Sequence, residues 1–210
     1  SSTQVQVVNS SGNSSAFLYI SGGWDLSTAT QTGQTWFRQM HGTFANRYGY
    51  GLYISGKNYI NLDKLNFLRY NSGIYYYNGC NNNTITSATC NSNTYGIYYV
   101  TSNNNTITSA TCNSNSQRGI YYTGSSNNTI TAQPQLESSY GIYYTGSNNN
   151  TIYALSTTGN TTAGIYSDNA NNICHSATIA ESTKVATGSA YYADTRQYIN
   201  NLGGYSYVYS

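Results

Sequence analysis

The apolar residues of this chain return at a fixed interval, in short alternating segments and not at helical spacing. Gly-Ile-Tyr or Gly-Leu-Tyr begins at Gly51, Gly73, Gly96, Gly119, Gly141 and Gly164, at intervals of roughly 22–23 positions. A second marker, Asn-Thr-Ile, keeps the same interval at Asn83, Asn105, Asn128 and Asn150. A sustained period of this length indicates a repeat architecture, in which each repeat is a structural unit that stacks on its neighbours.

Each repeat predicts strands and turns. In the segment Gly73–Tyr77, a period of two places Ile74 and Tyr76 on one face and Tyr75 and Tyr77 on the other. Thr, Tyr and Ile favour strands, whereas the intervening Asn, Ser and Gly favour turns. A leucine-rich repeat would need Leu at several fixed positions, and helical repeats favour Ala, Leu, Glu and Lys. The pattern therefore predicts coils of two or three short strands that stack in parallel at ~4.8 Å.

Stacking turns each repeat position into a column. We predict two inward aliphatic columns: Leu52, Ile74, Ile97, Ile120, Ile142 and Ile165, and Ile60, Ile85, Ile107, Ile130, Ile152 and Ile173. A column of turn asparagines is expected at Asn58, Asn83, Asn105, Asn128, Asn150 and Asn171. A further inward column contains Ile54, Tyr76, Tyr99, Tyr122 and Tyr144, whose hydroxyls would need partners. We expect one domain, residues 1–210, with clear repeats over 51–173 and atypical terminal coils over 1–50 and 174–210.

The repeats resemble a known family. The segment GIYYTGSSNNTI (Gly119–Ile130) is similar to the repeat of right-handed parallel β-helix proteins in the pectate-lyase-like superfamily. The segment GGWDLSTATQTGQTWF (Gly22–Phe37) resembles the opening coil of many secreted members. The resemblance implies an all-β fold, a right-handed parallel β-helix. It leaves the function open, because the superfamily includes polysaccharide lyases, hydrolases, adhesins and structural proteins.

Charge and hydropathy narrow the classes of partner. Charged residues make up 7% of the chain and the net charge is +2, so we expect no nucleic-acid partner. No run of ~20 apolar residues occurs, and we expect no membrane insertion. The chain begins Ser1-Ser2-Thr3 without Met or a signal-peptide pattern. We expect a processed, secreted protein, extracellular or at the cell surface, although a chosen N-terminus would look the same.

The acidic residues argue against catalysis. Lyases of the resembled superfamily hold calcium with clustered acids, and its hydrolases use two or three Asp residues. Here the acids are dispersed, at Asp25, Asp63, Glu137, Asp168, Glu181 and Asp194. His41 and His175 have no triad context, and no Cys/His cluster fits zinc. We therefore expect a protein that is not an enzyme, with no catalytic residue, no cofactor and no metal.

Two cysteines occupy the same position of adjacent repeats. Cys90 and Cys112 are one repeat apart, so the register makes them neighbours. A separation of ~4.8 Å between coils is within the range for a disulfide. A disulfide and two reduced, buried thiols both fit this pattern. Cys80 and Cys174 lie several coils apart and are not expected to pair.

Outward columns are the candidate binding or assembly surface. The central one is a predicted tyrosine ladder at Tyr53, Tyr75, Tyr98, Tyr121, Tyr143 and Tyr166, which suits stacking on sugar rings or packing against a protein. A shorter array of Thr pairs at 84/86, 106/108 and 129/131 resembles the flat face of β-solenoid ice-binding proteins. Glycosylation sequons recur at Asn82, Asn104, Asn127 and Asn149, a pattern that the frequency of Asn and Thr would also produce.

The two ends of the solenoid suggest a partner. Neither terminus carries an amphipathic capping helix, and both read as strands, with assembly residues Gln4, Val5, Gln6, Val7 and Val8, and Tyr205, Tyr207 and Tyr209. Exposed strand edges invite pairing with another chain. Our leading hypothesis is a secreted structural or adhesive protein that joins copies of itself end to end into a filament. The alternative is a monomeric carbohydrate-binding module or adhesin for polysaccharides or cell-surface glycans. An ice-binding protein and a polysaccharide-processing enzyme are the less favoured hypotheses.

Overall fold

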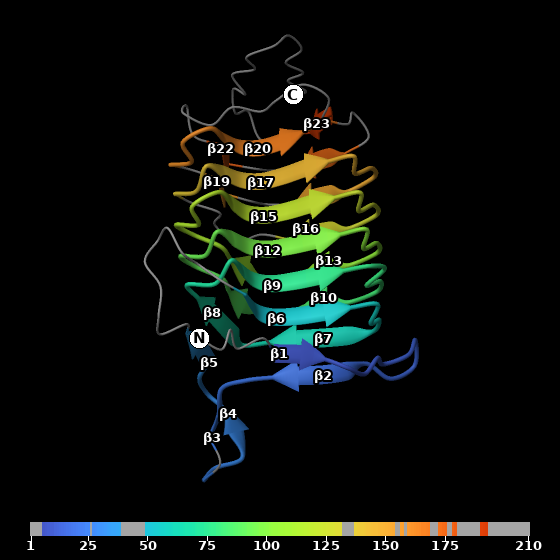
Figure 1. Cartoon of the computed structure of the whole chain (residues 1–210), viewed down its shortest axis with the longest axis vertical. Coiled ribbons are helices and arrows are strands. Elements are labelled where there is room, and N and C mark those ends of the chain that lie inside the picture. Colours follow the sequence, from blue (N-terminus) through green and yellow to red (C-terminus); the bar gives the residue numbers. More distant parts are fainter. Residues whose placement is uncertain are drawn as a thin grey trace.

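The chain winds into a stack of coils, each lying directly over the previous one (Figure 1). The computed structural model describes residues 6–25, 27–38, 49–131, 137–153, 156–157, 159–168, 172–175, 178–179 and 190–192. Within these ranges the secondary structure consists of strands β1 to β23, without a helix. It follows that no helix of the described part is long and apolar enough to cross a membrane.

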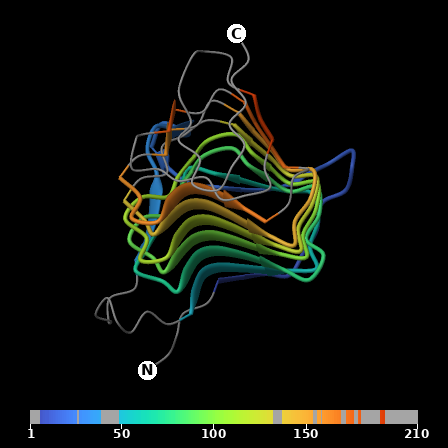
Figure 2. The same ribbon diagram turned by 90° about the horizontal axis from the view of Figure 1, so that it is seen from above.

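Parallel strands stack into three main sheets. The first sheet has seven strands, in the order β1 (Gln6–Val8), β6 (Tyr50–Ser55), β9 (Ser72–Tyr77), β12 (Tyr95–Val100), β15 (Arg118–Thr123), β17 (Tyr140–Thr145) and β20 (Ala163–Ser167). The second has eight, in the order β2 (Leu18–Ser21), β7 (Ile60–Asp63), β10 (Thr84–Ile85), β13 (Thr106–Ile107), β16 (Thr129–Thr131), β18 (Thr151–Tyr153), β21 (Ile173–His175) and β23 (Ala190–Tyr192). Viewed along the stack, these strands superimpose as the walls of a tube (Figure 2).

The remaining strands complete the coils and add one hairpin. The third sheet contains β5 (Thr35–Arg38), β8 (Leu65–Leu68), β11 (Ala88–Thr89) and β14 (Ala110–Thr111). Strands β19 (Ser156–Thr157) and β22 (Thr178–Ile179) pair in parallel. Strands β3 (Trp24–Asp25) and β4 (Thr30–Gln31) form an antiparallel hairpin that projects from the first coil (Figure 1).

The register confirms the predicted coil length and fold class. Ile97 is paired with Ile74 on one side and with Ile120 on the other, and Ile120 pairs with Ile142. These side chains are at most 1% exposed. Each coil therefore places the same residue type over its neighbour after one repeat of the sequence, as a parallel β-helix requires.

Two predicted columns need correction at their ends. Ile85 pairs with Leu62 and Ile152 pairs with Cys174, so Ile60 and Ile173 do not belong to that aliphatic column. The reason is the repeat length itself, since Leu62 and not Ile60 lies one coil before Ile85. Ile60 is nevertheless fully buried.

The asparagine column is real but has different end members. Oδ1 of each member accepts the backbone N–H of the residue one coil earlier, at 2.8–3.0 Å, along Asn83, Asn105, Asn128, Asn150 and Asn172. Asn58 instead accepts the N–H of Asn81 at 2.7 Å, in a neighbouring column. The predicted Asn171 lies outside the described residues. Each buried turn amide thus acquires an acceptor from the next coil, which satisfies polar groups that water does not reach.

The recurrent glycines allow the coils to approach closely. A Cβ added at Gly96 would lie 2.4 Å from the carbonyl oxygen of Gly119 and 2.8 Å from Cβ of Cys112. At Gly73 the equivalent atom would lie 2.7 Å from the carbonyl oxygen of Gly96. A side chain of any size would push these coils apart, which explains glycine at this position of the repeat.

The inward tyrosines form a stack inside the tube. The rings of Tyr76, Tyr99, Tyr122 and Tyr144 are completely buried, with centroids 4.6, 4.8 and 4.9 Å apart from one coil to the next. Their orientation agrees with the prediction. The expected partners are not found for three of the hydroxyls: those of Tyr76, Tyr99 and Tyr122 have no hydrogen-bond partner among the described residues.

Candidate functional site: the tyrosine face

The first sheet presents a continuous aromatic ladder outside the tube. Register pairs Tyr53 with Tyr75, Tyr75 with Tyr98, and so on through Tyr121, Tyr143 and Tyr166. Successive ring centroids are 5.7, 5.0, 4.4, 5.3 and 4.4 Å apart, and every ring is partly exposed. The structure therefore brings the six predicted ladder residues together, in the predicted order.

A second row lies beside the ladder, and sequence reasoning missed it. Tyr50 lies 4.5 Å from Tyr75, Tyr95 lies 5.3 Å from Tyr98, and Tyr140 lies 4.9 Å from Tyr143, measured between ring centroids. Strict alternation would turn these residues inward. The strands break alternation because glycine and the next aliphatic residue are both buried. The sequence contains a pattern that could have predicted this row, because each of its tyrosines directly precedes the glycine of the repeat. We call the ladder and this row together the tyrosine face.

One cation belongs to the tyrosine face. Arg118 pairs with Tyr95 and Tyr140 in the register, so it occupies the row position on β15. Its guanidinium carbon lies 4.3 Å from the ring centroid of Tyr121 and 4.2 Å from that of Tyr143. Such distances allow cation–π attraction of about 0.5–2 kcal/mol.

The hydroxyls of Tyr50, Tyr75 and Tyr98 stay protonated at neutral pH, because the pKa of each is raised. Burial, and then the neighbouring tyrosines, raise the pKa of Tyr75 to about 12. The same causes raise the pKa of Tyr98, and burial raises that of Tyr50. Each phenol therefore offers a donor and an acceptor to a ligand. Arg118 is left as the charged group of the face.

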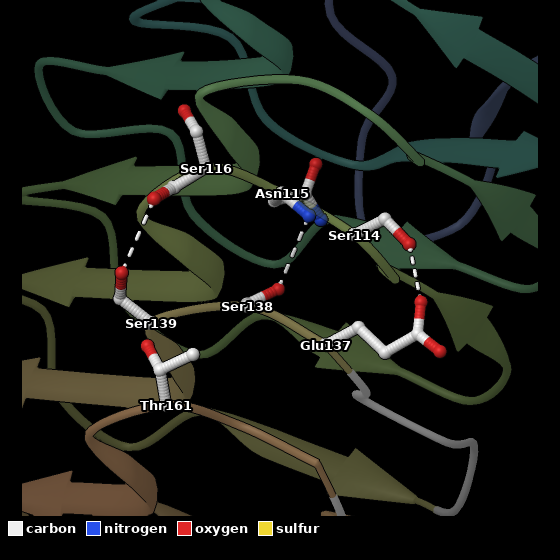
Figure 3. Close-up of a pocket in the computed structure, with 7 residues that line it drawn as sticks. All are labelled: Ser114, Asn115, Ser116, Glu137, Ser138, Ser139 and Thr161. Carbon is white, nitrogen blue, oxygen red and sulfur yellow. Dashed lines mark hydrogen bonds between the residues drawn. The ribbon is translucent and has the colours of Figure 1, made fainter.

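A polar pocket is lined by residues that directly precede β15 and β17, the strands that begin at Arg118 and Tyr140. Figure 3 shows the residues that line it. Its volume is about 280 Å³, and its lining is Ser114, Asn115, Ser116, Glu137, Ser138, Ser139 and Thr161. Glu137 accepts a hydrogen bond from Ser114 Oγ at 2.8 Å. Ser139 Oγ donates to the carbonyl of Ser116 at 3.2 Å. The lining offers hydroxyls and one carboxylate, which suits a ligand rich in hydroxyl groups.

The pocket arises where an asparagine column is interrupted. Asn93 donates its N–H to Asn115 Oδ1 at 2.9 Å, but Asn115 donates to Ser138 Oγ at 3.2 Å. Ser138 in turn donates to Asn160 Oδ1 at 3.0 Å. Serine is shorter than asparagine, and Nδ2 of Asn115 is buried with no hydrogen-bond partner among the described residues. The shorter side chain therefore leaves space that asparagine fills in other coils.

Cys80, Cys90 and Cys112 lie inside the tube, away from both surfaces. Thr89 pairs with Thr111, and the N–H of Cys90 donates to the Thr111 carbonyl at 2.8 Å, which puts Cys90 and Cys112 in adjacent coils. The described cysteines, Cys80, Cys90 and Cys112, are free and buried. Burial, reinforced by the Cys112 thiol, raises the pKa of Cys90 well above its usual value. The Cys90–Cys112 disulfide stays a prediction.

The remaining predicted surfaces are distributed over other parts of the molecule. The sequon residues Asn82, Asn104, Asn127 and Asn149 have φ between 54° and 58°. Asparagine tolerates this left-handed turn conformation, which by itself accounts for its recurrence. The Thr pairs belong to the second sheet, on β10, β13 and β16 and the turns after them. Of the predicted assembly residues, Gln6, Val7 and Val8 form β1, which pairs with β6. The others lie outside the described residues: Gln4, Val5, Tyr205, Tyr207 and Tyr209.

Comparison with known proteins identifies a family and a fold. Residues 27–210 match the family model described as periplasmic copper-binding protein (NosD). A crystal structure of a point mutant of the periplasmic alginate epimerase AlgG is similar with a TM-score of 0.58 at 16% identity, over 73% of this chain and 41% of that chain. A double mutant of AlgG gives a TM-score of 0.52 at 15% identity, over 94% of this chain and 57% of that one. The chain thus spans about half the length of these structures. No curated protein matches it.

These comparisons confirm one prediction and correct another. The resemblance to parallel β-helix repeat proteins is confirmed. The prediction that the protein is not an enzyme is contradicted, because solved structures with this fold are those of an epimerase. The prediction rested on the absence of clustered acidic residues. That criterion was too narrow, because it tests only for the catalytic sites of lyases and hydrolases. At 15–16% identity the likeness shows the fold alone.

Proposed function

Because this chain belongs to the family described as periplasmic copper-binding protein (NosD), we propose that it acts outside the cytoplasm and that its tyrosine face binds a polysaccharide. The observation that carries the proposal is the ladder of partly exposed rings, each in contact with the next, on one sheet. Six rungs at ~4.8 Å extend for about 24 Å, which is long enough for several sugar rings. This is the carbohydrate-binding alternative raised by the sequence.

The chemistry of the face fits a sugar polymer. The exposed carbon surface of the tyrosine rings packs against the apolar faces of sugars, and phenol hydroxyls bond to sugar hydroxyls. The rings pack on one another, with Tyr98 and Tyr121 at 4.4 Å, and so lose little conformational freedom when a ligand binds. The neighbouring polar pocket extends the hydroxyl-binding surface beyond the rings.

A double variant in the centre of the ladder tests this function. Tyr98→Ala with Tyr121→Ala should weaken polysaccharide binding by about 5- to 150-fold, because two aromatic contacts of about 0.5–1.5 kcal/mol each are lost. Thr108→Ala, on the exposed turn after β13 in the second sheet, is the matched control. Binding would be measured by affinity electrophoresis against a panel of neutral and acidic polysaccharides. Equal retardation of the double variant and the control would overturn the proposal.

The described residues do not fit the copper ion that the family description names. Thiolates are suitable Cu(I) ligands, but a ligand must be deprotonated. Cys80, Cys90 and Cys112 are 0% exposed, and the pKa values of Cys80 and Cys90 are raised by burial. Among described residues, no three His, Cys, Asp or Glu side chains are grouped as a metal site would require. The side chains of His41, Cys174 and His175 are not among those that the structure describes.

End-to-end assembly is a second candidate function, and it is favoured by the open strand edges and exposed aromatic rings of the first coil. Strands β1, β2 and β5 are the terminal strands of their three sheets and pair on one side only within the described structure. Tyr19, Trp24 and Trp36, on β2, β3 and β5, are 54–67% exposed. Open strand edges beside exposed aromatic rings suit a second copy of this chain.

Sedimentation velocity at micromolar concentration tests assembly. The unmodified chain should sediment as oligomers, and the double variant Tyr19→Lys with Trp36→Lys should sediment as a monomer, because charges on edge strands oppose pairing. Thr108→Lys, which adds charge on an exposed turn of the second sheet, is the control. A monomeric unmodified chain would remove this candidate and leave the glycan-binding proposal intact.

A further inference from the structure

Arg118 lies between two aromatic members of the row, Tyr95 and Tyr140. The coils on either side carry Tyr95 and Tyr140 at the paired positions, so a cation replaces a ring at this point. Between Tyr70 and Leu136 it is the only charged residue of the sequence. Replacing a ring by an arginine keeps a planar, stackable group and adds a positive charge with several donors.

The surroundings hold the guanidinium in place. Its carbon lies 4.2–5.8 Å from the ring centroids of Tyr95, Tyr121, Tyr140 and Tyr143. Gln117 Oε1 accepts hydrogen bonds from Nη1 of Arg118 at 3.3 Å and from the Tyr95 hydroxyl at 2.8 Å. The cation is therefore positioned by four rings and one amide before any ligand arrives.

Among the residues that the structure describes, no carboxylate pairs with this cation. In the described structure Arg118 forms no ion pair, and its Nε is buried without an acceptor. The acids of nearby coils are engaged elsewhere: Glu137 with Ser114, and Asp168 with Thr145 and Gly146. A partly desolvated cation without a counter-ion is attractive to an anion, and guanidinium pairs bidentately with carboxylate or sulfate.

We infer that Arg118 makes the tyrosine face selective for acidic glycans, whose carboxylate or sulfate groups pair with the guanidinium while the sugar rings stack on the tyrosines. This inference rests on the proposed glycan-binding function and adds the chemical class of the ligand. Stacking provides contacts that any sugar makes. The ion pair adds a contact that only a charged sugar makes, and it is strengthened by the low-dielectric aromatic surroundings.

Matched ligands isolate the charge. Oligomers of galacturonic acid are compared with the same oligomers after reduction of their carboxyl groups to alcohols, and a sulfated galactan with its desulfated form. Calorimetric titration of the full chain should show at least tenfold tighter binding of the acidic member of at least one pair. The pair that shows the preference identifies carboxylate or sulfate as the recognised group. The preference should shrink as salt is raised from about 20 to about 300 mM, because salt screens exposed charges.

Variants at Arg118 complete the test. Arg118→Gln and Arg118→Tyr, the latter matching the neighbouring coils, should bring the acidic-to-neutral affinity ratio to about one. Circular dichroism melting confirms that both fold, and Thr108→Ala should keep the ratio of the unmodified chain. A ratio unchanged in Arg118→Gln, or a preference for the neutral member in the unmodified chain, overturns the inference. Binding of no oligomer at all overturns the glycan-binding proposal itself.

Discussion

Replacing Tyr99 by Phe removes one oxygen from the interior stack and keeps the ring. Tyr99 is 0% exposed, and its ring lies 4.6 Å from that of Tyr76 and 4.8 Å from that of Tyr122, nearly parallel to both. Its hydroxyl has no hydrogen-bond partner among the described residues. The substitution therefore leaves the ring stacking unchanged and removes a buried polar group.

The expected change is a gain in stability. A buried polar group without a hydrogen bond destabilises a fold by about 1–3 kcal/mol. Loss of one oxygen opens only a small void, which offsets part of that gain. We therefore expect the free energy of unfolding of Tyr99→Phe to rise by about 1–2 kcal/mol. Most core substitutions lower stability, so the sign of the change is a demanding criterion.

Urea unfolding followed by circular dichroism measures this change. With a slope of about 2–3 kcal/mol per molar urea, the midpoint should rise by roughly 0.5 M. Tyr98→Phe is the matched control, because its ring belongs to the partly exposed tyrosine face one residue away, and its midpoint should hardly move. A fall of about 1 kcal/mol or more for Tyr99→Phe would refute the reasoning, since it would mean that the hydroxyl is hydrogen-bonded in solution.

Three further predictions address the coils and the phenols. Asn128→Ala removes the acceptor of the buried Asn105 N–H and should lower the unfolding free energy by about 2–3 kcal/mol in urea; an unchanged midpoint would contradict the role of the column. Gly96→Ala should cost about 1–3 kcal/mol, because the new Cβ would lie 2.4 Å from the Gly119 oxygen, and a neutral effect would show that the coils separate easily. Burial raises the pKa of Tyr75 to about 12, against ~10 when unfolded. The folded state then binds the proton more tightly, so stability should fall as pH rises from about 10 to 12; equal melting temperatures at pH 9 and 11 would argue against this.

The repeat alone predicted the coil and the composition of its faces, but not every register. Ile74 was placed inward and Tyr75 outward correctly, because parallel stacking gives each repeat position one environment. Ile60 was assigned to the wrong column, because the repeat before Asn83 is less regular. In that repeat an isoleucine lies two residues before Leu62, the residue that pairs with Ile85. Two coils with similar composition near a turn can be aligned in more than one register. The backbone pairing between the coils determines which residues are neighbours.

Strict alternation along a strand does not predict the row of tyrosines beside the ladder. Tyr95 and Tyr140 turn outward because glycine and the following isoleucine are both buried, which breaks alternation within the strand. Close contact between coils at the glycine causes this, and it depends on atoms of the neighbouring coil. The prediction from strict alternation therefore omitted the three tyrosines of this row, Tyr50, Tyr95 and Tyr140.

The amino-acid sequence by itself determined the coil length, the stacked parallel strands and the aromatic ladder, because an in-register solenoid repeats one local environment in every coil. The tertiary structure alone decided what lies between coils. It surrounds Arg118 with four tyrosine rings and opens a pocket where Ser138 interrupts a column of asparagines. Both features depend on distances between side chains of different coils, and these distances follow from how closely the coils pack, which a linear pattern does not contain.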